Sequence, residues 1–208
     1  MKKLIFDLDN TLLKWKPDYT KALEKTIEEF NLNIDYKVID AIIEQQEKIH
    51  DIMNKETLLN DINNSLNINL EMNFINRLFY NQGFLVEIDN DVIDTLTYLS
   101  KKYELVVLTN YFTEPQTERL KNALLIDFFT TIIGGDQVKI KPNIEAFKMA
   151  LGKTNPSDAT MIGDSLICDI EGALNAKLEV IQIDYYNKYK NNNSYKIIRN
   201  FKELKNLL

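Results

Sequence analysis

The order of apolar and polar positions divides the chain into two kinds of sequence. After a short apolar run, Leu4 to Phe6, residues 17 to 82 carry apolar positions at helical spacing without the alternation of a strand. Pro17 followed by Asp18 is typical of a helix start, and Asn-rich joints divide the segment into about four helices. The pattern therefore predicts an all-helical insert.

From Asp89 onward, helical patterns alternate with the short apolar runs "LVVLT", "TTIIG", "ATMIG" and "EVIQID". Repeated strand and helix in this order predicts a parallel sheet with helices on both faces. An exposed Asn- and Lys-rich loop near residue 190 precedes a final short strand and a helix in "FKELKNLL". We expect an α/β fold with a Rossmann-like parallel sheet core, formed by residues 1–14 and 85–208, and an inserted α-helical cap at 15–84.

Composition and charge narrow the class of protein. No apolar run among the 208 residues approaches the ~18 residues of a membrane span, and Asp7 and Asp9 interrupt the first run before a signal peptide could form. A single cysteine, Cys168, excludes an internal disulfide and suits a reducing compartment, so we expect a cytoplasmic protein. The net charge of -6 argues against binding to nucleic acid polymers or anionic membranes. An anionic substrate would need a local positive charge.

Polar residues gather where the expected strands end, and parallel sheets bind ligands beyond the carboxyl ends of their strands. These residues, with those of the adjacent loops, are Asp7, Asp9, Thr109, Asn110, Lys141, Asp164 and Asp169. Carboxylates packed this closely repel one another, so a cation is expected among them. Magnesium takes oxygen ligands together with substrate phosphate, which fits Asp7, Asp164 and the backbone carbonyl of Asp9. The amine, hydroxyl and amide of the same set would complete a phosphate cradle.

The acid pair of the first loop has a chemical interpretation. A carboxylate attacks a phosphate dianion poorly unless cations screen the charge, and covalent capture divides one difficult hydrolysis into two easier steps. A second carboxylate two residues along can serve as acid and then as base. We therefore expect the pair formed by Asp7 and Asp9 to supply one carboxylate for attack on phosphorus and another for proton transfer.

Four short motifs occur in a fixed order along the chain. They are "DLDNT" at 7–11, "VVLTN" at 106–110, "IKP" around Lys141 and "GDSLICD" at 163–169. Each is weak alone, but in this order the chain resembles the haloacid dehalogenase (HAD) superfamily of phosphotransferases. Within it, the pattern is similar to the capped branch that includes pyrimidine-type 5'-nucleotidases and small-metabolite phosphatases.

The resemblance implies roles for individual residues. Asp7 would be the nucleophile that becomes a phosphoaspartate, while Asp9 would protonate the leaving oxygen and then deprotonate the attacking water. The supporting residues would be Thr109 and Lys141 for the phosphate, Asp164 for magnesium, and Asp169 for orientation of the metal shell. The helical insert would act as a cap that closes over the site and reads the substrate.

No sequence pattern identifies the cap residues that would contact the substrate and determine specificity. The candidates are Trp15, Tyr19, His50, Arg77 and Tyr80. The neighbours of His50, "EQQEKI", are typical of a solvated helix face, so we expect that histidine to be exposed or structural. Cys168 is expected to be a structural thiol.

Several functions are compatible with these motifs. The first is magnesium-dependent hydrolysis of a small cytoplasmic phosphomonoester, such as a nucleoside monophosphate or a sugar phosphate, by a monomer or homodimer. The second is a phosphosugar mutase, which uses the same acid pair. A dehalogenase is disfavoured because Asp9 is retained. The last is a non-catalytic phospho-ligand-binding or signalling module such as a response-regulator receiver, although in receivers the phosphorylated Asp follows the acid pair on a later strand.

Overall fold

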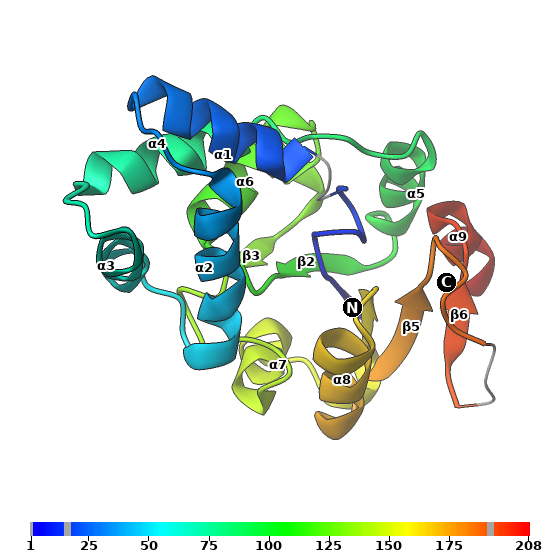
Figure 1. The fold of residues 1–208 in the computed structure, drawn as a ribbon. Coiled ribbons are helices and arrows are strands. Elements are labelled where there is room, and N and C mark those ends of the chain that lie inside the picture. The colour runs from blue at the N-terminus through cyan, green and yellow to red at the C-terminus, as the bar shows by residue number, and fades with distance from the viewer. Residues whose placement is uncertain (1, 15–17, 191–193) are drawn as a thin grey trace.

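A six-stranded parallel sheet forms the centre of the computed structural model, which describes residues 2–14, 18–190 and 194–208 (Figure 1). The strands follow the order β3-β2-β1-β4-β5-β6, and each neighbouring pair is parallel. Their bounds are β1 (Lys3–Phe6), β2 (Glu104–Leu108), β3 (Thr131–Ile133), β4 (Ala159–Gly163), β5 (Glu179–Ile183) and β6 (Lys196–Ile198). The expected α/β fold with a parallel sheet is confirmed.

Helices cover both faces of the sheet. Leu4 and Phe6 of β1 pack into one hydrophobic cluster, and Ile5 packs into another on the opposite face. The first face carries α5 (Asp91–Leu99), α6 (Thr113–Asn122) and α9 (Leu204–Leu207); the second carries α7 (Ile144–Leu151) and α8 (Gly172–Asn175). Because successive strand residues point to opposite faces, an uninterrupted apolar run is what a sheet buried on both sides requires.

The insert between β1 and β2 is helical, as its spacing predicts (Figure 1). It contains α1 (Asp18–Glu29), α2 (Tyr36–Ile49), α3 (Lys55–Leu66) and α4 (Met72–Gln82), which we call the helical unit. Polar caps start two of these helices: Asp35 accepts from the Lys37 N–H at 3.0 Å, and Asn54 accepts from the Thr57 N–H at 2.9 Å. The expected helix start at Pro17 lies outside the described residues, as does the candidate Trp15.

The helical unit packs against the sheet next to the strand ends. Its hydrophobic cluster continues into Phe112, whose ring lies 4.8 Å from that of Phe79. Backbone hydrogen bonds join the α2–α3 loop to the segment after β3: Met53 N–H to the Gly135 carbonyl and Ile140 N–H to the Asp51 carbonyl, both at 2.8 Å. These contacts hold α2 over the edge at which the sequence places its polar residues.

One element differs from its expected form. The α-helix expected between the runs "ATMIG" and "EVIQID" starts as a π-helix over Leu166–Glu171, which continues into α8. The N–H groups of Asp169 and Ile170 both donate to the Ser165 carbonyl, at 3.0 and 3.2 Å, which widens the turn. Among the described residues, no helix has the length and apolar character that crossing a bilayer requires.

Candidate active site

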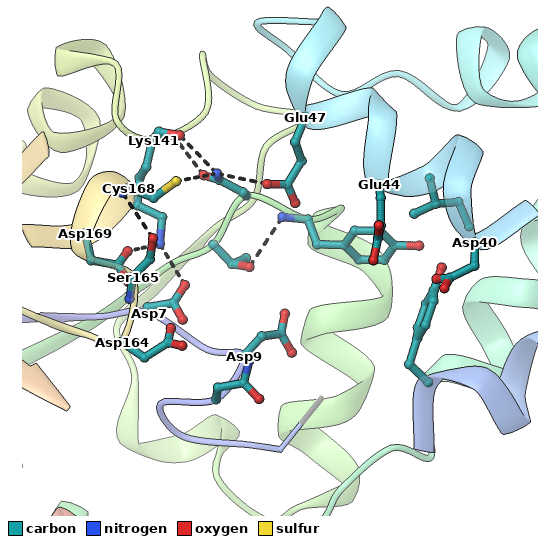
Figure 2. A pocket seen from close by; sticks show the side chains of 16 residues that line it. Asp7, Asp9, Asp40, Glu44, Glu47, Lys141, Asp164, Ser165, Cys168 and Asp169 are labelled. Carbon is teal, nitrogen blue, oxygen red and sulfur yellow. Dashed lines mark hydrogen bonds and ion pairs between the residues drawn. The ribbon is translucent and has the colours of Figure 1, made fainter. Parts of the chain in front are cut away.

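The turn after β1 presents the acid pair. The Asp7 N–H continues the ladder to the Ile162 carbonyl at 2.9 Å, and the chain then reverses, with the Leu12 N–H donating to the Leu8 carbonyl at 2.9 Å. Asn10 takes the left-handed conformation that this reversal needs, with φ 59°, which Asn tolerates better than most residues. Both carboxylates, Asp7 and Asp9, line one cavity beside the sheet edge (Figure 2).

Lys141 supplies a buried positive charge beside Asp7. Its ammonium donates to Asp7 Oδ1 and to Asp169 Oδ1, each at 2.7 Å (Figure 2). Burial alone would lower the pKa of this ammonium, but Asp169 and Asp7 raise it well above its ordinary value. Lys141 therefore remains charged and lies within hydrogen-bond distance of Asp7.

Asn110 holds the backbone of Lys141. The side-chain oxygen of Asn110 accepts from the Lys141 N–H at 2.8 Å, and its amide donates to the Lys141 carbonyl at 3.0 Å. Asn110 was expected to bind phosphate. In the structure its side chain holds the backbone of Lys141, and binding of phosphate by Asn110 stays a prediction.

The hydroxyl of Thr109 is oriented by its neighbours. The Thr109 side chain is buried, and its oxygen accepts from Gln116 Nε2 at 3.0 Å and from the Tyr111 N–H at 3.4 Å. Because both lone pairs are engaged, the hydroxyl proton remains to donate. Thr109 lines the same cavity as Asp7, so that donor suits a phosphate oxygen.

Asp169 is fixed by the loop that follows β4. One of its oxygens accepts from Lys141, and the other accepts from the Ser165 N–H at 3.0 Å. A Cβ on Gly163 would lie 2.3 Å from the Asp169 carboxylate, so the strand must end in glycine for Asp169 to pack there. Asp169 thus orients Lys141 and the loop that bears Asp164.

Three carboxylates meet at this edge and fit a divalent cation. Asp7, Asp164 and Asp169 each offer an oxygen within 4.8 Å of the others. Burial raises the pKa of Asp7 well above its ordinary value, with Lys141 opposing and the neighbouring carboxylates adding to the effect. Burial and Asp169 raise the pKa of Asp164 to about 7. A hard cation with oxygen ligands, such as Mg²⁺, would relieve this repulsion, and Asp7 and Asp164 are the pair best placed to hold it because Asp169 is engaged elsewhere.

The helical unit adds an acidic wall to the cavity. Asp40, Glu44 and Glu47 lie on one face of α2 at spacings of four and three residues, and all three line the cavity (Figure 2). Their helical spacing places them on one face, but the sequence alone does not show that this face borders a cavity. The cavity encloses about 230 Å³ and is open to solvent.

The cap candidates divide between this cavity and other places. Tyr19 is buried and lines the cavity. His50, at the end of α2, lies 3.7 Å from Asp61 of α3, and Arg77 pairs with Glu29 at 2.7 Å. The Tyr80 ring meets the Phe84 ring edge to face, with 5.2 Å between the centroids. Cys168, expected to be structural, lines the cavity, and burial raises the pKa of its thiol. Two unexpected side chains, Gln116 and Arg119 of α6, contact Asp9.

Replacing Asp164 by Asn tests the assignment of the cation site. Without divalent cations, Asp164 has a pKa of about 7 in the folded protein and about 4 in the unfolded chain. The folded protein therefore binds the proton more tightly, and the stability that this gives is lost as pH rises from about 4 to about 7. At pH 7.5 in EDTA, Asp164→Asn should therefore be more stable than the wild type by about 1–2 kcal/mol, because the amide removes a buried negative charge that solvent screens only in part. Urea unfolding measures this difference.

The same experiment with magnesium gives the opposite ranking. At about 100 times its Kd, Mg²⁺ should stabilise the wild type by about 2.7 kcal/mol and leave Asp164→Asn unchanged. The matched control is Asp94→Asn on α5, a carboxylate that is 79% exposed and lies outside the cavity. An Asp164→Asn protein that is destabilised in EDTA and still responds to Mg²⁺ would contradict the assignment.

Comparison with known proteins agrees with this geometry. The family model described as haloacid dehalogenase-like hydrolase matches residues 4–183. N-acylneuraminate-9-phosphatase from Rattus norvegicus is 36% identical over 95 residues, which cover 44% of this chain and 38% of that protein. A pyrimidine 5'-nucleotidase from Streptococcus pneumoniae is 30% identical over 112 residues, which cover 52% of this chain and 45% of that protein. Both alignments thus span less than half the length of the curated relative.

A solved structure shows the same fold over the whole chain. The HAD-hydrolase YfnB from Bacillus subtilis, crystallised with magnesium, superposes with a TM-score of 0.78 at 22% identity and covers 99% of this chain and 97% of that one. The family match spans almost the whole sheet, including every strand-end residue assigned above. The chain belongs to the haloacid dehalogenase-like hydrolase family.

Proposed function

We propose that the chain is a magnesium-dependent phosphatase that hydrolyses a small phosphomonoester through an aspartyl-phosphate on Asp7. The observation that carries the proposal is the contact of Asp7 with the Lys141 ammonium at 2.7 Å, in a cavity that also contains Thr109 and Asp164. These are the groups that neutralise and position a phosphoryl group. The names of the two relatives, a phosphatase and a nucleotidase, support the same reaction class.

Substrate binding places the phosphate against fixed donors. The Lys141 ammonium, the Thr109 hydroxyl and the Asn110 backbone N–H would each bind a phosphoryl oxygen. When bound by Asp7, Asp164 and the backbone carbonyl of Asp9, Mg²⁺ would screen the negative charge of the phosphate. With its charge screened in this way, the phosphate can be approached by the carboxylate of Asp7.

The reaction then has two steps. In the first, an Asp7 oxygen bonds to phosphorus as the bond from phosphorus to the leaving oxygen breaks, and Asp9 donates a proton to that oxygen. In the second, Asp9 takes a proton from a water molecule whose oxygen attacks phosphorus. Phosphate is released, Asp7 is regenerated as a carboxylate, and Asp9 is again protonated.

We assign residues 15–84 to the cap, because the helical unit covers the cavity opposite the catalytic edge. The leaving group would lie between Asp7 and the acidic wall of α2. That wall repels a second anionic group and accepts hydrogen bonds from hydroxyl or amine groups. With a cavity of about 230 Å³, below the ~300–1,000 Å³ of typical ligand pockets, a compact neutral or cationic leaving group fits best.

Phosphate release from a panel of esters tests the reaction. The panel holds p-nitrophenyl phosphate, nucleoside monophosphates and sugar phosphates, each with and without Mg²⁺. We expect magnesium-dependent release that falls at least about 10³-fold in Asp7→Asn, because the nucleophile is lost. Asp94→Asn, which removes a carboxylate far from the cavity, should keep full activity.

Other outcomes separate the alternatives. Unchanged turnover by Asp7→Asn would overturn the assignment of the nucleophile. An isomerised sugar phosphate without free phosphate would identify a mutase. A wild-type protein that converts no ester would indicate a non-catalytic phospho-ligand-binding module.

The acidic wall yields a separate prediction about substrate charge. Glu44→Gln removes one negative charge from the wall and keeps the shape of the side chain. The kcat/KM for an ester whose leaving group carries a second anionic group should rise by roughly 5-fold, equivalent to about 1 kcal/mol. The kcat/KM for an ester with an uncharged leaving group should change little. Glu56→Gln on α3, an exposed residue outside the cavity, is the control. Equal changes for both esters would show that Glu44 does not sense substrate charge.

A further inference from the structure

Helix α6 carries a fully buried arginine, Arg119, at 0% exposure. A guanidinium is buried only when its donors are satisfied. Arg119 contacts the carboxylate of Asp9 and donates to Gln116 Oε1 at 2.7 Å, to the Leu85 carbonyl at 2.8 Å and to the Lys14 carbonyl at 3.0 Å. These acceptors come from three separate parts of the chain, so the guanidinium joins them.

Two of these acceptors lie where the chain crosses between the sheet and the helical unit. Lys14 lies before α1 and Leu85 lies after α4. We call the chain at Lys14 and the chain from Leu85 to Glu87 the two crossings. The crossings run side by side, since the Lys14 N–H donates to the Glu87 carbonyl at 2.8 Å. The planar guanidinium has its donors in a fixed fork, so it binds both carbonyls only while the crossings keep this spacing.

Gln116 holds the other side of Asp9. It lies one turn before Arg119 on the same helix face, and its amide donates to Asp9 Oδ2 at 2.6 Å and to Thr109 Oγ1 at 3.0 Å. Each Asp9 oxygen therefore has its own partner on α6, Arg119 for Oδ1 and Gln116 for Oδ2. A carboxylate has about four lone-pair sites, so these contacts leave capacity for a leaving oxygen or a water.

We propose that Arg119 is a positioning residue that fixes the proton-transferring carboxylate of Asp9 to the two crossings of the helical unit. The inference rests on the proposed function, which assigns proton transfer to Asp9. Any shift of a crossing moves an acceptor of the guanidinium, and the same guanidinium sets the orientation of Asp9. The position of the helical unit and the geometry of proton transfer are thus tied through one side chain, and proton transfer depends steeply on that geometry.

The dependence of rate on the leaving group tests the proposal. An alkyl phosphate needs a proton on its leaving oxygen, whereas p-nitrophenolate leaves readily without one. The kcat/KM includes the step in which that bond breaks, so it reports the proton transfer. In Arg119→Lys, kcat/KM should fall about 100-fold for an alkyl phosphate and less than about 10-fold for p-nitrophenyl phosphate, because one ammonium cannot reach Asp9 and both carbonyls together.

A second variant and a control keep the test decisive. Gln116→Met leaves Arg119 in place and should shift the ratio of the two kcat/KM values in the same direction by several-fold, even if Arg119→Lys folds poorly. Leu120→Ala removes a buried neighbour on the same helix that packs into the hydrophobic cluster of the sheet. It should lower the melting temperature and reduce both kcat/KM values by the same factor.

The outcomes separate this inference from the function on which it rests. Unequal losses in Arg119→Lys and Gln116→Met, with equal losses in Leu120→Ala, support positioning of Asp9. Equal losses in all three variants, with an active wild type, overturn this inference and leave the phosphatase intact. A wild type that releases no phosphate from either ester overturns the proposed function and this inference together.

Discussion

The ammonium of Lys141, buried between Asp7 and Asp169, is the interaction on which the rest of the site depends. It joins the loop after β1 to the π-helix that follows β4, and Asn110 beyond the end of β2 holds its backbone. A buried charge is tolerated only when opposite charges and hydrogen bonds surround it, and loss of the lysine would leave two carboxylates without their partner. The same contact that assembles three strand ends thus also supplies the positive charge that the proposed phosphate site needs.

The site holds more negative charge than Lys141 can balance. Among the described residues that line the cavity, Lys141 is the one basic side chain, beside the carboxylates of the catalytic edge and those of α2. Burial raises the pKa of Asp7 and of Asp164, and the neighbouring carboxylates add to the effect. The excess of negative charge is the physical reason for assigning a divalent cation. In a chain with net charge -6, the proposed binding of an anionic phosphate depends on the positive charge of Lys141 and of a bound cation.

Much of this arrangement could be predicted from the sequence, because local patterns determine it. Apolar runs predict the strands, and helical spacing of apolar residues predicts the helical unit. Polar residues after the strands predict the edge of the sheet at which the cavity lies. The π-helix at Leu166–Glu171 could not be predicted, because it depends on how Asp169 folds back onto Ser165 and Lys141.

Features that depend on contacts between distant parts of the chain could not be predicted from the sequence either. The acids of α2 are typical of a solvated face until the helix is placed over the cavity. Arg119 is ordinary in a polar helix until Lys14 and Leu85, 105 and 34 residues away, are brought to it. Asn110 was correctly expected at the strand end, but the use of its amide on Lys141 depends on a loop 31 residues later.

The central claim is that phosphoryl transfer passes through Asp7, and the stereochemical course at phosphorus tests it most directly. A phosphorothioate ester whose phosphorus carries sulfur and two different oxygen isotopes is hydrolysed in water labelled with the third isotope, and the configuration of the released chiral thiophosphate is determined. Two successive in-line displacements, first by Asp7 and then by water, predict retention of configuration. Inversion would mean that water attacks the substrate directly, and would contradict the account.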